Sequence, residues 1–515
     1  MNPSEDMTTQ NDSAPRNGNA PGSTSVTDDR SRWLALYVLC AGVLMIVLDA
    51  TVVNVALPSI QDDLGFSSSS LAWVVNAYLI AFGSSLLLAG RLGDLMGRRN
   101  IFLAGMAIFT GLSLVCGLAP TQGVLVGARF FQGIGGAMTA AVALGMIVTM
   151  FPEPREQAKA IGVYAFVASA GGSVGLIAGG VLTQALSWHW IFFINIPIGI
   201  FTAVMAIRLV TKDRGIGFAG GADIPGAVLI VSSLMLGVYT IVSPAEQKGW
   251  GASLTIGLGI LTVLLLVAFI VREATAKNPL VPLRIFKSRN VSGANLIQGM
   301  AVVGMFGIFF LGALYVQRVL GYDALQTGLA FLPTTICMGT LSIRYSERLI
   351  MRFGARQVVI PGLVMIMLAL ILFTQSPVDG GYWLHVLPVM ILLGTGAGAA
   401  FPALAALAMS GATPEDAGLA SGLVNTSAQV GGAIGLALLA TFSASRTTAL
   451  LNDGNSHLEA LNGGYHLAYW IGAGFVLAAI AVAFFMLENV KPPAHAPEGG
   501  ADPAAEPDPA LSEFV

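Results

Sequence analysis

The chain has 515 residues, of which 55% are hydrophobic and only 10% are charged, and its mean hydropathy is +0.76. Soluble domains carry roughly 25% charged residues, so this composition excludes an ordinary soluble domain and indicates a protein that lies in lipid. The net charge of −3 is too small to indicate a nucleic-acid partner. The spacing of Cys40, Cys116 and Cys337 matches no metal or redox motif, so we expect buried thiols and no metal site.

Apolar segments of about 20 residues recur along the chain with short polar breaks, which is the pattern of membrane-spanning helices. They predict an all-α fold with about fourteen spans. The predicted spans are 33–57, 70–90, 100–119, 122–149, 159–184, 189–209, 222–243, 252–271, 292–316, 325–348, 356–375, 383–409, 415–442 and 464–487. The polar termini, 1–30 and 491–515, have no apolar core and predict disordered tails.

Basic residues predict how these spans are oriented, because cytoplasmic loops are enriched in Lys and Arg. Most of the 25 basic residues lie in the N-terminal tail or in loops after even-numbered spans. The opposite side has only Lys248, Arg318 and Arg446. We therefore expect both termini in the cytoplasm, which requires an even number of spans.

The two halves of the chain resemble each other, and repeated halves around a mid-membrane site are typical of transporters. A shift of 257 positions pairs three residues of the first half with identical residues of the second: Arg91 with Arg348, Gly97 with Gly354 and Arg99 with Arg356. A shift of 260 positions pairs five more: Pro154 with Pro414, Gly162 with Gly422, Gly171 with Gly431, Gly172 with Gly432 and Gly175 with Gly435. The predicted organisation is a tail (1–30), a six-helix bundle (31–212), a two-helix insertion (213–275), a second six-helix bundle (276–490) and a tail (491–515).

Two charges lie deep inside apolar spans, Asp49 in the first and Arg129 in the fourth. A charge at that depth costs about 2.5–3.5 kcal/mol even on mild insertion scales, so such residues are functional candidates. Both fall in the outer half of the bilayer core, where pairing across a cavity is geometrically allowed. We predict that Asp49 and Arg129 couple transport to protons; a structural salt bridge or helix cap for Asp49, and a hydrogen-bond hub for Arg129, are the alternatives.

Other polar and glycine positions supply further candidates. The segment GRLGDLMGRRN (Gly90 to Asn100) predicts a conformational-switch loop, since its glycines allow close backbone approach and its charges can pair at a moving interface; a plain basic loop is the alternative. The members of this loop are Gly90, Arg91, Gly93, Asp94, Gly97, Arg98 and Arg99. The candidates for the substrate cavity, or for helix–helix hydrogen bonds, are Asn54, Asn76, Tyr78, Gln132, Asn425 and Gln429. The helix-packing candidates are Gly133, Gly135, Gly136, Gly171, Gly175, Gly179 and Gly180.

The segment GRLGDLMGRRN resembles the signature between the second and third spans of the major facilitator superfamily. The segments LDATVVNVALPSI (Leu48 to Ile60), RFFQGIGGA (Arg129 to Ala137) and WHWIFFINIPIG (Trp188 to Gly199) are similar to motifs of its fourteen-span drug:proton antiporter branch. The resemblance covers residues 33–490 and implies two six-helix bundles plus two additional central helices. In GGSVGLIAGG (Gly171 to Gly180), Leu176 replaces the proline usual in the fifth-span motif, so the kink of that proline is not expected.

The second half retains glycines but lacks the charges of the first. Asp94, Asp49, Arg129 and Gln132 correspond to Met351, Phe306, Met390 and Leu393. We therefore hypothesise that proton coupling resides in the N-terminal half, while the C-terminal half contributes cavity wall and movement.

These patterns and the resemblance together predict a multi-pass transporter of the bacterial cytoplasmic membrane. It is expected to export amphipathic or cationic drugs, dyes or antibiotics by alternating access, with the proton as coupling ion and no other cofactor. The chain has no P-loop motif, so no ATP is expected, and no nucleophile, metal or cofactor constellation that would predict an enzyme. The alternatives are a dedicated exporter of one metabolite or self-made antibiotic, and a membrane sensor or scaffold without transport.

Overall fold

The computed structural model describes residues 26–213, 215, 217, 221–410 and 417–488. This part of the chain is helical and contains no strand. Thirteen of its helical segments are long and apolar enough to cross a membrane. Helix α5 (Pro154–Ala185), with its shorter apolar stretch Val174–Ala185, completes the expected fourteen. The all-helical fold is therefore confirmed.

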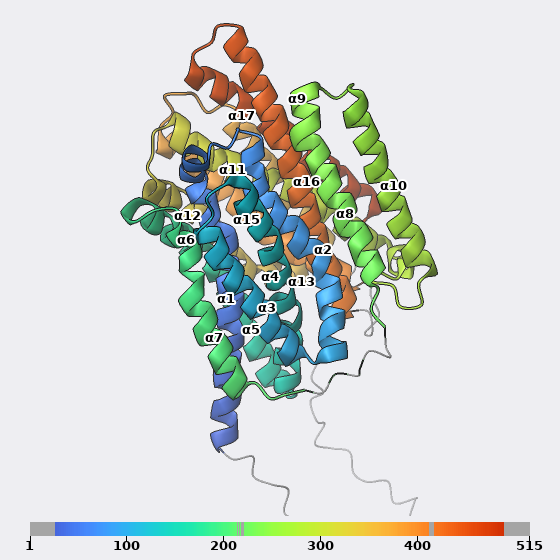
Figure 1. Ribbon diagram of the computed structural model, residues 1–515. Coiled ribbons are helices and arrows are strands. Elements are labelled where there is room, and N and C mark those ends of the chain that lie inside the picture. Colours follow the sequence, from blue (N-terminus) through green and yellow to red (C-terminus); the bar gives the residue numbers. More distant parts are fainter. Residues whose placement is uncertain (1–25, 214, 216, 218–220, 411–416, 489–515) are drawn as a thin grey trace, which may run out of the picture.

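The first half forms a bundle in which α4 packs on both α2 and α3, α1 packs on α5, and α7 packs on α1 and α3 (Figure 1). Its elements are α1 (Val26–Leu64), η1 (Ser70–Ala72), α2 (Trp73–Met96), α3 (Arg98–Gly117), α4 (Gln122–Met150), α5, α6 (Trp190–Phe193) and α7 (Asn195–Leu209). The Thr121 hydroxyl accepts a hydrogen bond from the Val124 amide. This cap explains why α4 begins at Gln122.

The second half forms a bundle with the same pattern of contacts, α14 on α15, α11 on α16, and α17 on α11 and α14. Its elements are η4 (Leu283–Lys287), α11 (Arg289–Leu314), η5 (Tyr315–Val319), α12 (Ala324–Thr340), η6 (Leu341–Tyr345), α13 (Ser346–Phe353), α14 (Ala355–Phe373), η7 (Tyr382–Val386), α15 (Leu387–Ser410), α16 (Ala417–Asn452) and α17 (His457–Met486). Capping boxes open α12 at Asp323 and α17 at Ser456.

The turns that join the second and third spans of each half have the same geometry. Gly97 and Gly354 have φ of 93° and 89°, a conformation that residues with a Cβ rarely adopt. The arginine two positions after each glycine donates to a carbonyl of the last helix of its bundle, Arg99 to Ile207 and Arg356 to Phe484. The sequence repeat therefore corresponds to a repeat in local structure.

The residues between the halves form a pair of helices, α8 (Ile224–Thr240) and α10 (Ser253–Thr275), joined through η3 (Ile241–Ala245) and α9 (Glu246–Lys248). They lie together at one side of the molecule, beside α2 and α16 (Figure 1). Most of α10 is exposed, as expected for a helix that faces lipid. Asp223 caps α8 by accepting from the Gly226 amide at 3.1 Å.

The first helix is longer than its predicted span, 33–57. Helix α1 begins at Val26 and ends at Leu64, so it includes the last residues of the expected tail 1–30 and continues through Pro58. The apolar pattern marked only the part of this helix that crosses lipid, whereas its polar ends form further turns. Residues 1–25 and 489–515 lie outside the described residues, and so does the expected start of the span 415–442, up to residue 416.

We expect Gly135→Ala to destabilise the protein by about 1–3 kcal/mol, because a methyl group there overpacks a closed helix contact. Its Cβ would lie 2.7 Å from the Phe109 nitrogen and 2.9 Å from the Gly105 carbonyl oxygen, so backbone must move. Gly127→Ala on the same helix is the matched control, since nothing lies within 4 Å of its Cβ position. Thermal unfolding in one detergent measures both; equal melting temperatures would contradict the expectation.

Candidate functional site

The structure brings Asp49 of α1 and Arg129 of α4 into direct contact. Nη1 of Arg129 donates a hydrogen bond to Oδ2 of Asp49, and the two side chains are 1% and 0% exposed. The depth of the two residues along their spans allowed pairing across a cavity; in the structure the carboxylate and the guanidinium touch. Two full charges can be buried here because the carboxylate and the guanidinium neutralise each other.

Amide side chains complete the coordination of this ion pair. Gln132 lies one turn after Arg129, accepts from its Nη1 at 2.8 Å and donates to Oδ1 of Asp49 at 2.9 Å. Asn195, the first residue of α7, donates to the same Oδ1 at 2.9 Å. Ser113 of α3 accepts from Gln132 at 2.8 Å and from Asn195 at 3.4 Å. Helices α4 and α7 therefore meet at the carboxylate of α1, and α3 joins this cluster through Ser113.

The remaining face of the guanidinium is covered by α2. Nε of Arg129 donates to the Val74 carbonyl at 3.1 Å, and its Cζ lies 4.3 Å from the centroid of the Tyr78 ring. An aromatic face attracts a cation, most strongly where water is excluded. The Tyr78 side chain thus holds Arg129 in place, and its hydroxyl has no hydrogen-bond partner among the described residues.

The other predicted cavity residues form no hydrogen bond with this ion pair in the described structure. Asn54 donates to the Ala50 carbonyl of its own helix at 3.3 Å. Asn76 is fully buried, and neither of its side-chain polar atoms has a partner in the described structure. On α16, Asn425 is exposed, and Gln429 packs against Gly83 of α2.

The expected switch loop is mostly helix. Gly90, Arg91, Gly93 and Asp94 belong to the last turns of α2, and the turn itself is Gly97 alone, which caps α2 and precedes α3. Arg98 donates to Asp94 at 3.1 Å and to the Gly145 carbonyl of α4 at 3.1 Å, so this basic side chain bridges α2, α3 and α4. The other members are placed as follows: Gly93 lies against Val142, and Arg91 donates to the Gly221 carbonyl.

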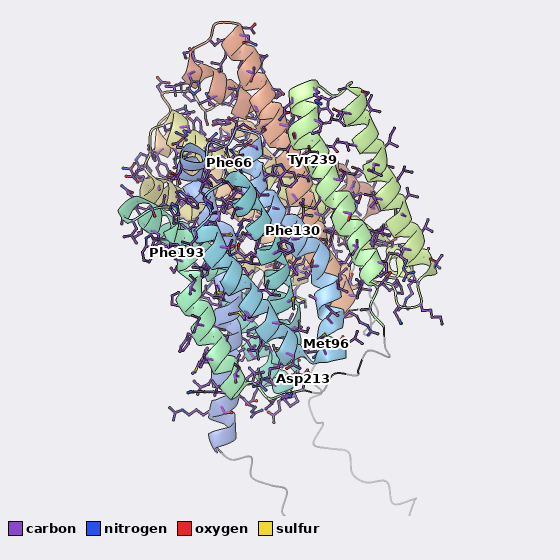
Figure 2. All side chains as sticks on the ribbon, in the orientation of Figure 1. Phe66, Met96, Phe130, Phe193, Asp213 and Tyr239 are labelled. Atoms are coloured by element: carbon purple, nitrogen blue, oxygen red, sulfur yellow. The ribbon has the colours of Figure 1, made fainter. Side chains whose placement is uncertain are left out.

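Asp213, which follows α7, caps the start of α3. Its two carboxylate oxygens accept from the Arg98 amide at 2.6 Å and the Arg99 amide at 3.1 Å. Figure 2 labels Asp213 and Met96 near one another at one end of the molecule, where the α2–α3 turn lies. An anion at the positive end of a helix is a favourable arrangement.

We expect Asp213→Ala to destabilise the protein by about 1 kcal/mol, because two helix-end amides lose their acceptor. Transport should slow as well, since the α2–α3 turn loses its anchor to the end of α7. Lys212→Ala, a change at the preceding exposed residue, is the control. Melting temperature and initial transport rate in vesicles are the measurements, and an unchanged melting temperature would refute the capping role.

The packing candidates all lie at close helix contacts. The contacts that their Cβ positions would meet are the Tyr78 backbone for Gly133, the Phe109 backbone for Gly135, the Tyr78 hydroxyl for Gly136, Leu44 and Val47 for Gly171, Thr51 for Gly175, Val52 for Gly179 and Leu325 for Gly180. Leu176 is buried, and its carbonyl oxygen lies 2.4 Å from the Cβ position of Gly328. The backbone of α5 at Leu176 thus packs directly on α12, within one continuous helix.

The corresponding positions of the second half form an apolar contact. Met390 and Leu393 are both fully buried, and Thr334 lies 3.1 Å from the Met390 sulfur. The same fold therefore accommodates either an ion pair or apolar side chains at this place.

Sequence reasoning missed Asn195, Ser113 and Asp213. Asn195 lies within the quoted segment WHWIFFINIPIG, where a polar amide among apolar residues was the available signal. Ser113 carried no comparable signal, because serine is common in membrane helices and forms hydrogen bonds within its own helix. Asp213 resembled any other charge in a polar loop between two spans.

Two repeated helical bundles with a buried ion pair inside one of them define a membrane transporter of the secondary type. Comparison with known proteins agrees: the family model for the Major Facilitator Superfamily matches residues 39–436. The chain belongs to this superfamily and is a transporter, not an enzyme.

Curated relatives span nearly the whole chain. The puromycin resistance protein of Streptomyces alboniger is 39% identical over 90% of this chain and 92% of its own length. The cephamycin export protein of Amycolatopsis lactamdurans is 37% identical over 91% of this chain and 94% of its own. Among solved structures, a bacterial homologue of the human lysosomal transporter Spinster, inward-facing and unoccupied, has a TM-score of 0.63 at 16% identity, covering 90% of this chain and 97% of that one. The bacterial relatives place the protein in the cell membrane.

Proposed function

We propose that the protein is a proton-driven exporter of amphipathic or cationic drugs, dyes or antibiotics, with both termini in the cytoplasm. The observation that carries the proposal is the buried ion pair between Asp49 and Arg129. Arg129 keeps its charge, whereas a carboxylate can take up a proton and become neutral. Protonation of Asp49 would remove its attraction for Arg129 and loosen the junction of α1, α4 and α7.

The contacts between the bundles support a conformation that is closed at the outer side. At the end opposite the α2–α3 turn, Arg318 pairs with Asp62, Gln317 donates to the Val55 carbonyl at 2.9 Å, and Gln184 donates to Asp323 at 3.1 Å. Alternating access requires these contacts to break. Because Asp49 and Arg129 are buried in this conformation, the same rearrangement must admit water to the ion pair.

The test is substrate-induced proton release from the purified protein across a diverse compound set. An antiporter that exchanges cargo for a proton acidifies an unbuffered solution when the cargo binds. We expect release with several unrelated amphipathic cations, and none with matched polar solutes. The absence of proton release with every compound that binds would refute proton coupling.

A dedicated exporter of one antibiotic is the second candidate, since the names of the relatives from Streptomyces and Amycolatopsis each refer to one compound. The two candidates differ in breadth. Resistance to a panel of unrelated dyes and drugs in a sensitive host favours the multidrug exporter, and protection against a single compound favours the dedicated one.

A further inference from the structure

The two-helix insertion encloses a pocket against the bundles. Its volume is about 400 Å³, within the range of small-molecule sites. The lining residues come from α2, α8, α10, α16 and the segment around η4, and most of them are apolar. The walls contributed by Leu266 and Ile270 of α10 are 39% and 46% exposed, so the pocket borders the surface that faces lipid.

One wall of this pocket contains a buried acid. Glu273 of α10 is 3% exposed, and its Oε2 accepts from the Val281 amide at 2.8 Å. Its Oε1 is buried and has no hydrogen-bond partner among the described residues. A buried charged oxygen without a partner is costly, so this position is a candidate for binding a cation.

The charges around Glu273 do not cancel. Asp223 accepts from Nε of Arg272 at 3.0 Å and 3.2 Å, so this one base lies between two acids and is hydrogen-bonded to Asp223. Both Asp223 and Glu273 approach Gly226, whose Cβ position lies 2.7 Å from one carboxylate and 2.8 Å from the other. This cluster of two acids and one base has an excess negative charge at the end of the pocket, which attracts a cation.

The inner wall of the pocket is the seam where the two bundles meet. Ser84 of α2 and Thr426 of α16 line the pocket, and Thr426 donates to the Gly83 carbonyl at 3.1 Å. The Cβ position of Gly83 lies 2.6 Å from Cβ of Gln429, so the helices touch there. A molecule in the pocket therefore needs only a separation of α2 and α16 to pass between the bundles.

We propose that this pocket binds a lipophilic cation that has partitioned into the membrane, with its apolar body among α8, α10 and α16 and its charge toward Glu273. The inference deepens the proposed function, on which it rests, and gives the insertion a role as the wall of a lateral entry site. A phospholipid is the less suitable occupant, because the phosphate of its head group would meet the excess negative charge.

Equilibrium binding of radiolabelled tetraphenylphosphonium to the purified full-length protein tests the assignment. Glu273→Gln keeps an acceptor for the Val281 amide and removes the charge; we expect its dissociation constant to rise about five- to tenfold. Leu266→Trp, which fills the pocket, should weaken binding to a similar extent. Leu261→Trp is the matched control on the same helix, outside the pocket lining, and should bind as the wild type does.

Wild-type affinity in both Glu273→Gln and Leu266→Trp would overturn the assignment, and so would a co-purified phospholipid that occupies the pocket and is not displaced by tetraphenylphosphonium. Thermal unfolding of each variant shows whether it is folded, and the two variants alter different properties of the same pocket, its charge and its free volume. Proton-driven export by the wild type is measured separately. Pocket binding without such export contradicts the proposed function alone.

Discussion

Replacing Asp49 by Asn is expected to abolish pH-gradient-driven export while the protein remains folded. Asparagine has nearly the same shape but cannot take up a proton, so the junction of α1, α4 and α7 loses its titratable group. Its Oδ1 can still accept from Arg129, whereas its amide then faces Gln132 and Asn195, which are also donors. We therefore expect some loss of stability, up to about 3 kcal/mol.

Inverted vesicles with an imposed pH gradient measure the expected loss of export, and size-exclusion chromatography in detergent verifies that the variant is folded. Asp379→Asn, a change of an exposed acid in the C-terminal half, is the control and should transport at the wild-type rate. Undiminished gradient-driven export by Asp49→Asn would show that another group carries the proton, and the proposed mechanism would then be wrong.

The pairing of Asp49 with Arg129 could be predicted from the sequence, because a charge in an apolar helix is stabilised by few kinds of partner. Their depth along the two spans already allowed contact. That the two side chains touch, instead of facing each other across a cavity, depends on the rotation of α1 and α4 about their axes. Sequence periodicity did not determine this rotation, since polar groups that could distinguish one face of these helices from another are few.

The turn at Gly97 and the pocket beside α10 depend on tertiary packing, which the sequence pattern did not predict. The glycines of Gly90–Asn100 suggested a loop, yet residues to Met96 continue α2, because glycine is tolerated in a membrane helix that packs closely on its neighbour. Nothing in the sequence indicated that Oε1 of Glu273 would be buried without a hydrogen-bond partner among the described residues. Whether an acid near a span end reaches water or lies under a neighbouring segment depends on tertiary packing, here of residues 280 and 281 over the end of α10.

Replacing Asp49, Arg129 and Gln132 together by apolar residues is expected to restore stability without restoring transport. Arg129→Met alone leaves the buried Asp49 without its cation and should destabilise the protein by about 3–5 kcal/mol. The triple variant Asp49→Leu, Arg129→Met, Gln132→Leu removes the uncompensated charge together with its main amide partner. Buried ion pairs can be exchanged for apolar side chains at little cost, so most of this loss should be recovered.

The C-terminal half supplies the internal precedent, because Met390 and Leu393 occupy the corresponding positions and are fully buried in the same arrangement of helices. Melting temperatures of the wild type, the single variant and the triple variant in one detergent measure the recovery, and gradient-driven export is measured in the same preparations. A triple variant as unstable as Arg129→Met would mean that the polar junction is needed for the fold. A triple variant that still exports against a gradient would remove Asp49 and Arg129 from the coupling mechanism. A stable, inactive triple variant separates the two roles, because the helices then pack as before and only the exchangeable proton is missing.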